Sequence, residues 1–574
     1  MHLGISAYFH DSTVALLDDS GQLIDFKKEE WLSRVKGDKS FPRLALNEII
    51  SEHKLNNENL KFICFYEKPL KAWLTILKHS LKNNSITNEV TRNYFKNIWN
   101  SSLIFQYDLL KHTKFNLNKT IYCDHHLSHT LSGFYYTNSL PINSIVIDGY
   151  GDSSCSTIHH IKSNNEIIKI WESDYPNSLG LFYSAITDFL GFAINEGEYK
   201  VMGLAAYGKP EYFEKLNETI YFKNKKLIID DSYYDFVRSI KNSFSSKLID
   251  LFKINPRESN VNLDINSANF QTYANIAASA QKVIEYNLSE IFKYAYEVTK
   301  IKNFIFTGGV AMNSVAINKL IQNDFIKNIF VPPSPGDSGA AIGAAYYAYI
   351  NKKNEKALLK KTNIKKPDVY FPGVIKNSEE DESFITLGFK KLASNREFVD
   401  ASANLIFEGK ILATCFGNIE TGPRALGHRS LICNGHNELV VNQLNNVIKQ
   451  RSKFRPVAPV ILEKNAKSYF DISDKVYESY FYMGSVANVK NDKIKEIKPV
   501  THFDNTARVQ ITTNETLLGK ILTKLESKKI HVIANTSFNI SSDPMVYSKE
   551  DAYLSCERMG IKYLLTENNL YCKD

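Results

Sequence analysis

The chain has 574 residues, of which 43% are hydrophobic and 23% are charged, and it carries a net charge of +8 at pH 7. That length exceeds what one hydrophobic core supports and predicts roughly two to four domains. The positive charge suits anionic ligands but is too thinly spread for a nucleic-acid-binding chain. No apolar run reaches the ~18 residues that span a bilayer, so we expect no membrane span.

The cysteines and the first residues indicate the compartment. Seven cysteines are scattered along the chain, and none forms a Cys-X-X-Cys pair. This usage is typical of a reducing environment. The opening MHLGISAYFHDS lacks a basic region followed by an apolar stretch, so we expect no secretory signal and a cytoplasmic protein.

The first part of the chain alternates short apolar runs with polar or glycine turns, the pattern of strands and hairpins. One longer segment shows helical periodicity, and another is polar with spaced aromatic residues and is also predicted to be helical. The expected elements are strands at 3–7, 13–17 and 144–147, a helix within 178–193, and helices through 212–265.

The middle of the chain predicts a strand, a glycine turn and a helix within 304–321, then a loop that opens a small-residue helix within 331–349. The lysine-rich stretch 351–366 is predicted to be a solvated linker or the end of a helix, and Tyr-Phe-Pro-Gly-Val at 370–374 marks a domain boundary. Beyond it, the segments GKILATCFGN, KIHVIANTSFN and KYLLTENNLYC predict strands separated by helices.

Three histidines stand close together in CDHHLSHTLSG at 123–133. On a helix, His125 and His129 share a face at i,i+4, and His126 and His129 do so at i,i+3. Either pair could bind a divalent metal, but this spacing alone is commoner in helices that bind none. A metal centre needs further ligands, usually carboxylates.

Two aspartates are candidates for those further ligands. Asp148 ends an apolar strand just before a glycine, and Asp337 lies in SPGDSGAAIG ahead of a predicted helix. Each aspartate alone fits a turn or a helix cap equally well. The combined pattern of two histidines and two aspartates favours a metal centre.

A glycine turn, GGVAMNS at 308–314, follows a predicted strand and opens a helix. Such a turn lets backbone amides approach a nucleotide closely, so Gly308, Gly309 and Asn313 are candidate nucleotide-binding residues. Neither a P-loop nor a dinucleotide-binding glycine motif is present. Hairpin loops near the N-terminus combined with later glycine turns instead favour the two facing loops of an actin-like ATPase core.

The last third of the chain disperses basic side chains among proline, glycine and apolar residues. This arrangement favours convergent phosphate contacts over a nucleic-acid groove, because aromatic interleaving is limited to Phe454. The candidate residues are Arg424, Lys449, Arg455 and Arg508, together with Ser537 in the strand-ending segment NTSFN.

Taken in order, nine segments resemble the O-carbamoyltransferases of nodulation-factor and antibiotic biosynthesis. They are YFHDST, HHLSH, IDGYGD, EGEYKVMGLAAYG, GGVAMN, PGDSGAAIG, GPRALGHRS, KFRPVAP and NTSFN. The resemblance implies an α/β enzyme with two domains. Residues 1–365 would form an actin-like, Kae1-like carbamoyl-transfer domain, and residues 366–574 a YrdC-like α/β domain that forms carbamoyl adenylate.

The implied reaction has two steps. The second domain would make carbamoyl adenylate from carbamoyl phosphate and ATP, with Mg²⁺ on the ATP phosphates. The first domain would transfer the carbamoyl group to a hydroxyl of a small-molecule or glycan acceptor that contains a sugar. The family metal is iron, so Fe²⁺ or another divalent metal is expected in the first domain.

The resemblance also assigns roles to residues. It implies metal binding by His125, His129, Asp148 and Asp337, with His126 as a neighbour, and catalysis by His10, with Asp11 beside it. Lys36 would contact carbamoyl adenylate, and the basic cluster and Ser537 would form the adenylation site. This chain departs from the family pattern at Trp31, Gly37 and 542–544.

Two other functions remain open at this level. One is an actin-like ATP-binding regulatory protein without transfer chemistry, for which a second phosphate-rich site would have no use. The other is tRNA threonylcarbamoyl transfer, which the modest positive charge disfavours because it offers no clear tRNA-binding surface. The resemblance names neither the acceptor nor the oligomeric state, a homodimer being one option.

Overall fold

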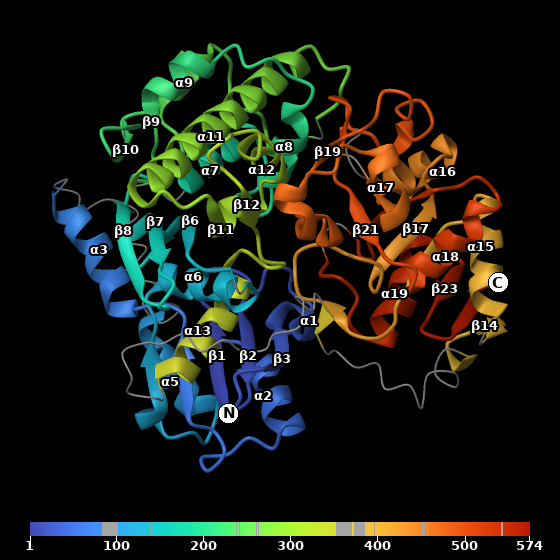
Figure 1. The fold of residues 1–574 in the computed structure, drawn as a ribbon, viewed down its shortest axis with the longest axis horizontal. Helices are drawn as coiled ribbons and strands as arrows, with labels where there is room; N and C mark the ends of the chain where they lie inside the picture. The colour runs from blue at the N-terminus through green and yellow to red at the C-terminus, as the bar shows by residue number, and fades with distance from the viewer. Residues whose placement is uncertain are drawn as a thin grey trace. The chain divides into compact units, whose positions relative to one another are not determined.

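The computed structural model describes residues 1–82, 102–137, 139–236, 238–239, 242–259, 261, 263–351, 370–371, 385–394, 397–449, 454–455, 457–540 and 543–573. The chain divides into two compact units (Figure 1). Unit 1 comprises Met1–Glu29 and Gly37–Pro367, and unit 2 comprises Glu30–Lys36 and Asp368–Asp574. The predicted linker after Asn351 and the predicted boundary at 365/366 lie outside the described residues.

The first sheet of unit 1 has the strand order β3-β2-β1-β4-β5. Its strands are β1 (His2–Ser6), β2 (Thr13–Leu17), β3 (Leu23–Lys28), β4 (Phe62–Phe65) and β5 (Thr120–Tyr122). The first three strands pair antiparallel, whereas β4 and β5 add parallel to β1. The predicted N-terminal hairpin is therefore confirmed, and both of its strands are buried along their whole length.

The second sheet repeats this plan with the order β12-β11-β6-β7-β8. Its strands are β6 (Ile142–Gly151), β7 (Ser154–Ile161), β8 (Ile167–Asp174), β11 (Asn303–Thr307) and β12 (Asn328–Phe330). Again three strands pair antiparallel, and two more add parallel to the first of them. Two sheets with the same order and directions make unit 1 an α/β structure with the duplicated layout of the actin-like fold.

Helices α6 (His125–Tyr135) and α13 (Asp337–Asn351) pack against each other between the two sheets (Figure 1). Helix α13 also contacts β1, β2 and β4, and α6 also contacts β6 and β11. Small residues allow this close approach. A Cβ added at Gly343 would lie 1.8 Å from the carbonyl oxygen of Ser128, and one added at Gly4 would lie 2.0 Å from that of Ala341.

The remaining helices of unit 1 include the predicted helix at 178–193, which is confirmed as α7. The strand, glycine turn and helix predicted within 304–321 are also confirmed. The helices are α2 (Arg43–Glu52), α3 (Pro69–Lys82), α5 (Phe105–His112), α7 (Leu179–Phe189), α8 (Glu198–Ala205), α9 (Phe213–Thr219), α10 (Ser246–Phe252), α11 (Phe270–Thr299) and α12 (Ser314–Leu320).

The prediction of helices through 212–265 is wrong in the first part of this range, where β9 (Ile220–Lys223) and β10 (Lys226–Ile229) form an antiparallel hairpin. Asn224 and Lys225 join the two strands, and both have left-handed backbones, with φ of 52° and 63°. Two such residues form the tight turn that matches the twist of paired strands. A two-residue turn signal was therefore missed within a stretch whose polar character resembled a surface helix.

Unit 2 contains an eight-stranded mixed sheet in the order β14-β24-β23-β15-β17-β22-β18-β21. Helices α15 (Glu397–Phe407) and α18 (Leu517–Glu526) pack together, and their buried residues share one apolar core with six of the strands. The sheet's strands are β14 (Phe389–Ser394), β15 (Leu412–Thr414), β17 (Ser430–Asn434), β18 (Ala458–Leu462), β21 (Gln510–Thr512), β22 (Val532–Ser537), β23 (Tyr563–Leu565) and β24 (Asn569–Lys573).

Strands predicted in all three segments of this region are confirmed as β15, β22 and the β23–β24 hairpin. Two-stranded sheets pair β13 (Tyr370–Phe371) with β16 (Ile419–Glu420) and β19 (Ala487–Asn488) with β20 (Thr506–Ala507). The other helices are α1 (Glu29–Ser33), α16 (Glu438–Asn442), α17 (Glu463–Tyr469) and α19 (Lys549–Met559). Among the described residues, no helix combines the length and apolarity that crossing a membrane requires.

We expect Gly343→Ala to lower the stability of unit 1 by about 1–3 kcal/mol, because the new methyl group must displace the α6 backbone. Where space is free, alanine stabilises a helix relative to glycine by about 1 kcal/mol, so the sign of the effect is diagnostic. Calorimetric melting of the variant measures it. The control Gly336→Ala, whose Cβ would meet only the methyl carbon of Met312 at 3.7 Å, should melt near the wild type.

Candidate metal centre and phosphate-binding cluster

Four predicted ligands come together in unit 1. His125 and His129 lie on α6, Asp148 lies near the end of β6, and Asp337 is the first residue of α13. All four side chains are buried, and one ligand atom from each lies within 4.8 Å of the other three. Residues from three separate elements thus form a compact set of two imidazoles and two carboxylates.

The loops around this centre set the positions of its ligands. The carboxylate of Asp148 accepts hydrogen bonds from the backbone N–H of Gly149 at 2.7 Å and of Gly309 at 3.0 Å. The first turn of α6 is held by Asp152, whose carboxylate accepts from the N–H of His125 at 2.9 Å. Sequence reasoning missed Asp152, although it ends the quoted motif IDGYGD.

The glycine turn at 308–314 packs against the end of β6 and caps helix α12. Gly308 has a φ of 88°, and a Cβ there would lie 2.3 Å from the carbonyl oxygen of Ile147, so only glycine fits. Asn313 caps α12 by accepting from the N–H of Ala316 at 3.0 Å. The turn therefore orients the Asp148 carboxylate through Gly309, and its predicted contact with a nucleotide stays a prediction.

Both imidazoles direct nitrogen atoms at the carboxylates. The Nδ1 of His129 lies 3.2 Å from the carbonyl oxygen of Pro335, which can only accept, so Nδ1 carries the proton. The Nε2 of His129 lies 3.3 Å from both the Oδ2 of Asp148 and the Oδ1 of Asp337. Neither this Nε2 nor either ring nitrogen of His125 has a hydrogen-bond partner among the described residues.

The electrostatics favour a bound cation. Burial lowers the pKa of His129, but the close contact of its Nε2 with the carboxylate of Asp337 and the charges of Asp148 and Asp337 outweigh burial and raise the pKa. At His125 burial prevails, and the pKa is lowered. Two buried carboxylates are costly unless compensated. Two imidazole nitrogens and two carboxylate oxygens suit a divalent metal such as iron or zinc, so the residues fit the predicted metal.

His126 lies outside this set. Its Nδ1 lies 3.1 Å from the hydroxyl oxygen of Thr157, and its side chain is fully buried. Burial holds the pKa of His126 well below its ordinary value, so the ring is neutral. These contacts are those of a packed histidine in the core.

The predicted catalytic pair adjoins the centre on the loop between β1 and β2. His10 Nδ1 lies 3.1 Å from the Oδ2 of Asp11, and its Nε2 lies 4.0 Å from the Oδ2 of Asp337. Burial lowers the pKa of His10, but the charge of Asp337 and the hydrogen bond with Asp11 raise it to about 10. Asp11 and Tyr8 have left-handed backbones, with φ of 52° and 76°, which is uncommon for residues other than glycine.

In unit 2, Lys449 and Ser537 both donate hydrogen bonds to Asn539, a residue that sequence reasoning missed. The buried Nζ of Lys449 donates to the side-chain oxygen of Asn539 at 2.9 Å and to the carbonyl oxygen of Ser537 at 2.9 Å. The Ser537 hydroxyl donates to the same Asn539 oxygen at 2.6 Å. Asn539 could have been found as the last residue of the motif NTSFN.

Loop 420–430 is organised from within by Glu420 and Arg429. The Oε1 of Glu420 accepts from the backbone N–H groups of Leu426 at 2.7 Å and His428 at 3.0 Å. Arg429 is fully buried and donates to the carbonyl oxygens of Phe416 at 2.5 Å and Gly417 at 3.1 Å. Arg429 therefore braces the loop from within.

The other predicted basic residues of unit 2 are half-buried, and their convergence on phosphate stays a prediction. They are Lys36, Arg424, Arg455 and Arg508. The backbone carbonyl oxygen of Arg455 accepts a hydrogen bond from the side-chain amide of Asn445 at 2.9 Å.

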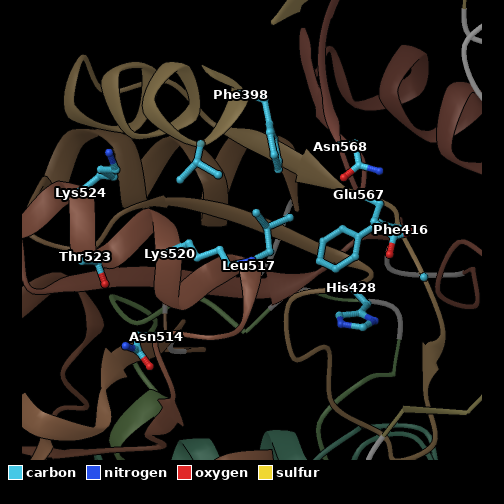
Figure 2. A pocket seen from close by; sticks show the side chains of 12 residues that line it. Phe398, Phe416, His428, Asn514, Leu517, Lys520, Thr523, Lys524, Glu567 and Asn568 are labelled. Carbon is cyan, nitrogen blue, oxygen red and sulfur yellow. The ribbon is translucent and has the colours of Figure 1, made fainter. Parts of the chain in front are cut away.

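Unit 2 also contains a hollow of about 800 Å³ beside α15 and α18 (Figure 2). Apolar rings and charged side chains line it together, among them Phe398, Phe416, His428, Lys520 and Glu567. No member of the predicted basic cluster is among these described lining residues. The hollow is therefore not the predicted phosphate site.

Two family models match this chain. The model for the carbamoyltransferase N-terminus matches residues 1–346, and the model for the carbamoyltransferase C-terminus matches residues 403–573. An uncharacterized protein of Synechocystis sp. is 30% identical over 616 aligned positions, covering 100% of this chain and 96% of that protein.

Relatives with assigned names are more distant. Nodulation protein NolNO of Sinorhizobium fredii is 27% identical, over 95% of this chain and 76% of its own length. The 3'-hydroxymethylcephem-O-carbamoyltransferase of Amycolatopsis lactamdurans is 26% identical, over 46% of this chain and 48% of its own length. Among solved structures, the activator of the 2-hydroxyisocaproyl-CoA dehydratase from Clostridium difficile aligns with 14% identity and a TM-score of 0.34, over 63% of this chain and 99% of that one.

We expect the purified protein to retain one divalent metal ion per chain after anaerobic loading with Fe²⁺, and His129→Ala to lower that content by about an order of magnitude. Loss of either carboxylate or of His125 should act in the same direction. Inductively coupled plasma mass spectrometry after desalting measures the bound metal.

His126→Ala is the matched control, because it removes an imidazole from the same helix without touching the four-residue set. It should keep the metal even if the protein becomes less stable. Loss of metal in His126→Ala together with full retention in His125→Ala would contradict this assignment of ligands.

Proposed function

Because this chain belongs to the carbamoyltransferase family, as the sequence motifs predicted, we propose that it is an ATP-dependent O-carbamoyltransferase. Carbamoyl phosphate, ATP and water would give carbamoyl adenylate, pyrophosphate and inorganic phosphate in unit 2. Unit 1 would then transfer the carbamoyl group from the adenylate to an acceptor hydroxyl, with release of AMP. Transferase activity follows from the family, and the use of ATP and the division of steps are our proposal.

The single observation that carries the proposal for unit 1 is the buried set of two imidazoles and two carboxylates next to His10 and Asp11. A divalent cation held by His125, His129, Asp148 and Asp337 would supply Lewis acidity and offset the Asp337 charge that keeps His10 protonated. Asp11 orients His10 through Nδ1, which leaves Nε2 to take the proton from the acceptor hydroxyl.

For unit 2, the support is the tethered group of Lys449, Ser537 and Asn539 at the end of β22. The Lys449 ammonium and the Ser537 hydroxyl use their donors within this group, so they would favour phosphate by placing a buried positive charge beside a loop of fixed shape. Lys36, Arg424, Arg455 and Arg508 would add the remaining positive charge, and Mg²⁺ would accompany ATP. This division assigns the Kae1-like transfer step to residues 1–365 and the YrdC-like activation step to residues 366–574.

The acceptor we propose is a hydroxyl of a sugar-containing small molecule or glycan. The name of the Amycolatopsis lactamdurans relative specifies O-carbamoyl transfer on a hydroxymethylcephem, and other relatives are nodulation proteins. These names support a small-molecule acceptor and give no support to tRNA. We further propose that the reaction takes place in the cytoplasm, where both ATP and carbamoyl phosphate are found.

We expect the wild-type protein to release pyrophosphate only when ATP and carbamoyl phosphate are both present. Lys449→Ala should reduce this release about 10²-fold, because it removes the buried cation that fixes Ser537 and Asn539. His129→Ala should keep pyrophosphate release but stop the acceptor from gaining the mass of a carbamoyl group. A coupled pyrophosphate assay and mass spectrometry over a panel of glycosides measure the two steps.

Lys464→Ala is the control in this assay, because Lys464 belongs to an exposed ion pair with Glu526 in the same unit. It should leave both steps unchanged. If the wild type releases no pyrophosphate with carbamoyl phosphate, the activation step is wrong, and the actin-like ATP-binding regulatory protein becomes the better description.

A further inference from the structure

A short piece of the N-terminal chain belongs to the other unit. Glu30–Lys36 makes its contacts within unit 2, whereas Glu29 before it and Gly37 after it belong to unit 1. Ordering such an excursion has an entropic cost that specific contacts must offset. The side chains of Trp31 and Arg34 make those contacts.

Both side chains bind the loop that leads from β22 into α19. Trp31 is buried, and its ring stacks on that of Tyr547 at 5.9 Å with an angle of 15° between the planes. The Arg34 guanidinium donates to the carbonyl oxygens of Met545 at 2.9 Å and Pro544 at 3.3 Å. Arg34 has a left-handed backbone, with φ of 58°, so these contacts hold it in a conformation that arginine rarely adopts.

The same guanidinium supports the carboxylate that shapes the end of this loop. The Nε of Arg34 lies 3.2 Å from the Oδ1 of Asp551. The Oδ2 of Asp551 accepts from the backbone N–H groups of Tyr547 and Ser548, both at 3.0 Å, and so caps α19. Arg34 therefore contacts two backbone carbonyls of the loop and also the Asp551 carboxylate, which itself accepts hydrogen bonds from two backbone amides of the loop.

The start of the loop carries the proposed nucleotide contacts. Asn539, which binds Lys449 and Ser537, donates through its side-chain amide to the carbonyl oxygen of Asp543 at 2.6 Å. The N–H of Val546 donates to the carbonyl oxygen of Phe538 at 3.1 Å, which closes the loop on itself. A movement of residues 543–548 would thus shift the side chain of Asn539.

We propose that Arg34 is a positioning residue for the proposed phosphate-binding loop, whose described residues are 537–540 and 543–548, and that the segment 30–36 thereby completes the activation site of unit 2. This inference rests on the proposed function for the binding of a nucleotide at this loop, whereas the contacts of Arg34 with the loop stand by themselves. The planar fork of arginine is required, because its separate N–H groups reach acceptors on three different residues. A lysine offers a point charge and reaches fewer of them.

The test compares Arg34→Ala and Arg34→Lys with the wild type in the full-length chain. Pyrophosphate release with ATP and carbamoyl phosphate gives kcat and KM, and hydrogen exchange follows the amides of 537–548. We expect Arg34→Ala to raise the KM for ATP about tenfold, with a smaller effect on kcat, and to speed exchange in this loop. Arg34→Lys should fall between alanine and the wild type in both readouts.

Arg558→Ala is the matched control. Arg558 also pairs with this loop, at 3.4 Å from the Oδ2 of Asp543, but both side chains are exposed. Its KM for ATP and its loop exchange should stay within about twofold of the wild type.

A purely structural role for Arg34 would lower the melting temperature while leaving both the KM for ATP and the exchange of 537–548 unchanged, and that result would overturn the proposal. If Arg34→Ala does not fold, Arg34→Lys decides by the same two readouts. Absence of pyrophosphate release from the wild type would refute the proposed function instead, and the exchange measurement would still decide whether Arg34 holds the loop.

Discussion

Two buried carboxylates facing two imidazoles are the constraint on which the organisation of unit 1 depends. Negative charge removed from water must be compensated by donors, cations or both. The Asp148 carboxylate accepts hydrogen bonds from the backbone amides of Gly149 and Gly309. The Asp337 carboxylate lies close to the histidines of α6 and, at longer range, to His10. Helices α6 and α13 can supply these groups only because glycine lets them approach closely, as at Gly343.

The duplicated sheets explain why these groups meet. β6 and β11 run parallel in one sheet, and β1 has the same central position in its sheet that β6 has in the other. Asp148 lies near the carboxyl end of β6, Gly308 follows β11, and His10 follows β1. Loops that follow such strands are the usual place for ligand sites in α/β proteins, because parallel strands end at the same edge. The centre uses this property in both halves of the duplication.

In unit 2, the predicted site residues are positioned mainly by hydrogen bonds between buried polar side chains and the backbone of the loops. Lys449, Ser537 and Asn539 bind one another. Glu420 accepts from three backbone amides of its loop, and Arg429 donates to two backbone carbonyls. Each loop is thus held in one shape by a polar side chain buried beneath it. A loop whose shape is fixed before a ligand arrives needs little rearrangement to bind it.

The sequence by itself determined the family, the order of the motifs and the identities of the four clustered residues, because each motif combines a strand end or helix start with a distinctive polar residue. It could not separate His125 from His126 by spacing alone, since both lie within one turn of His129 on a helix. It also missed the β9–β10 hairpin, the capping role of Asp152 and the bracing role of Arg429. The hairpin is local, but its turn is formed by Asn224 and Lys225, which the polar pattern did not mark as a turn. The roles of Asp152 and Arg429 depend on contacts with residues 12 to 27 positions away, which local periodicity does not encode.

Only the tertiary structure decided which partners each side chain has. The packing of α6 against β7 gives His126 a threonine as its partner, whereas the ends of β6 and α13 give His129 two carboxylates. It likewise assigned residues 30–36 to unit 2, because the stacking of Trp31 and the hydrogen bonds of Arg34 join positions more than 500 residues apart. Sequence patterns specify faces and turns, but buried charge and hydrogen bonds are satisfied only when distant segments meet.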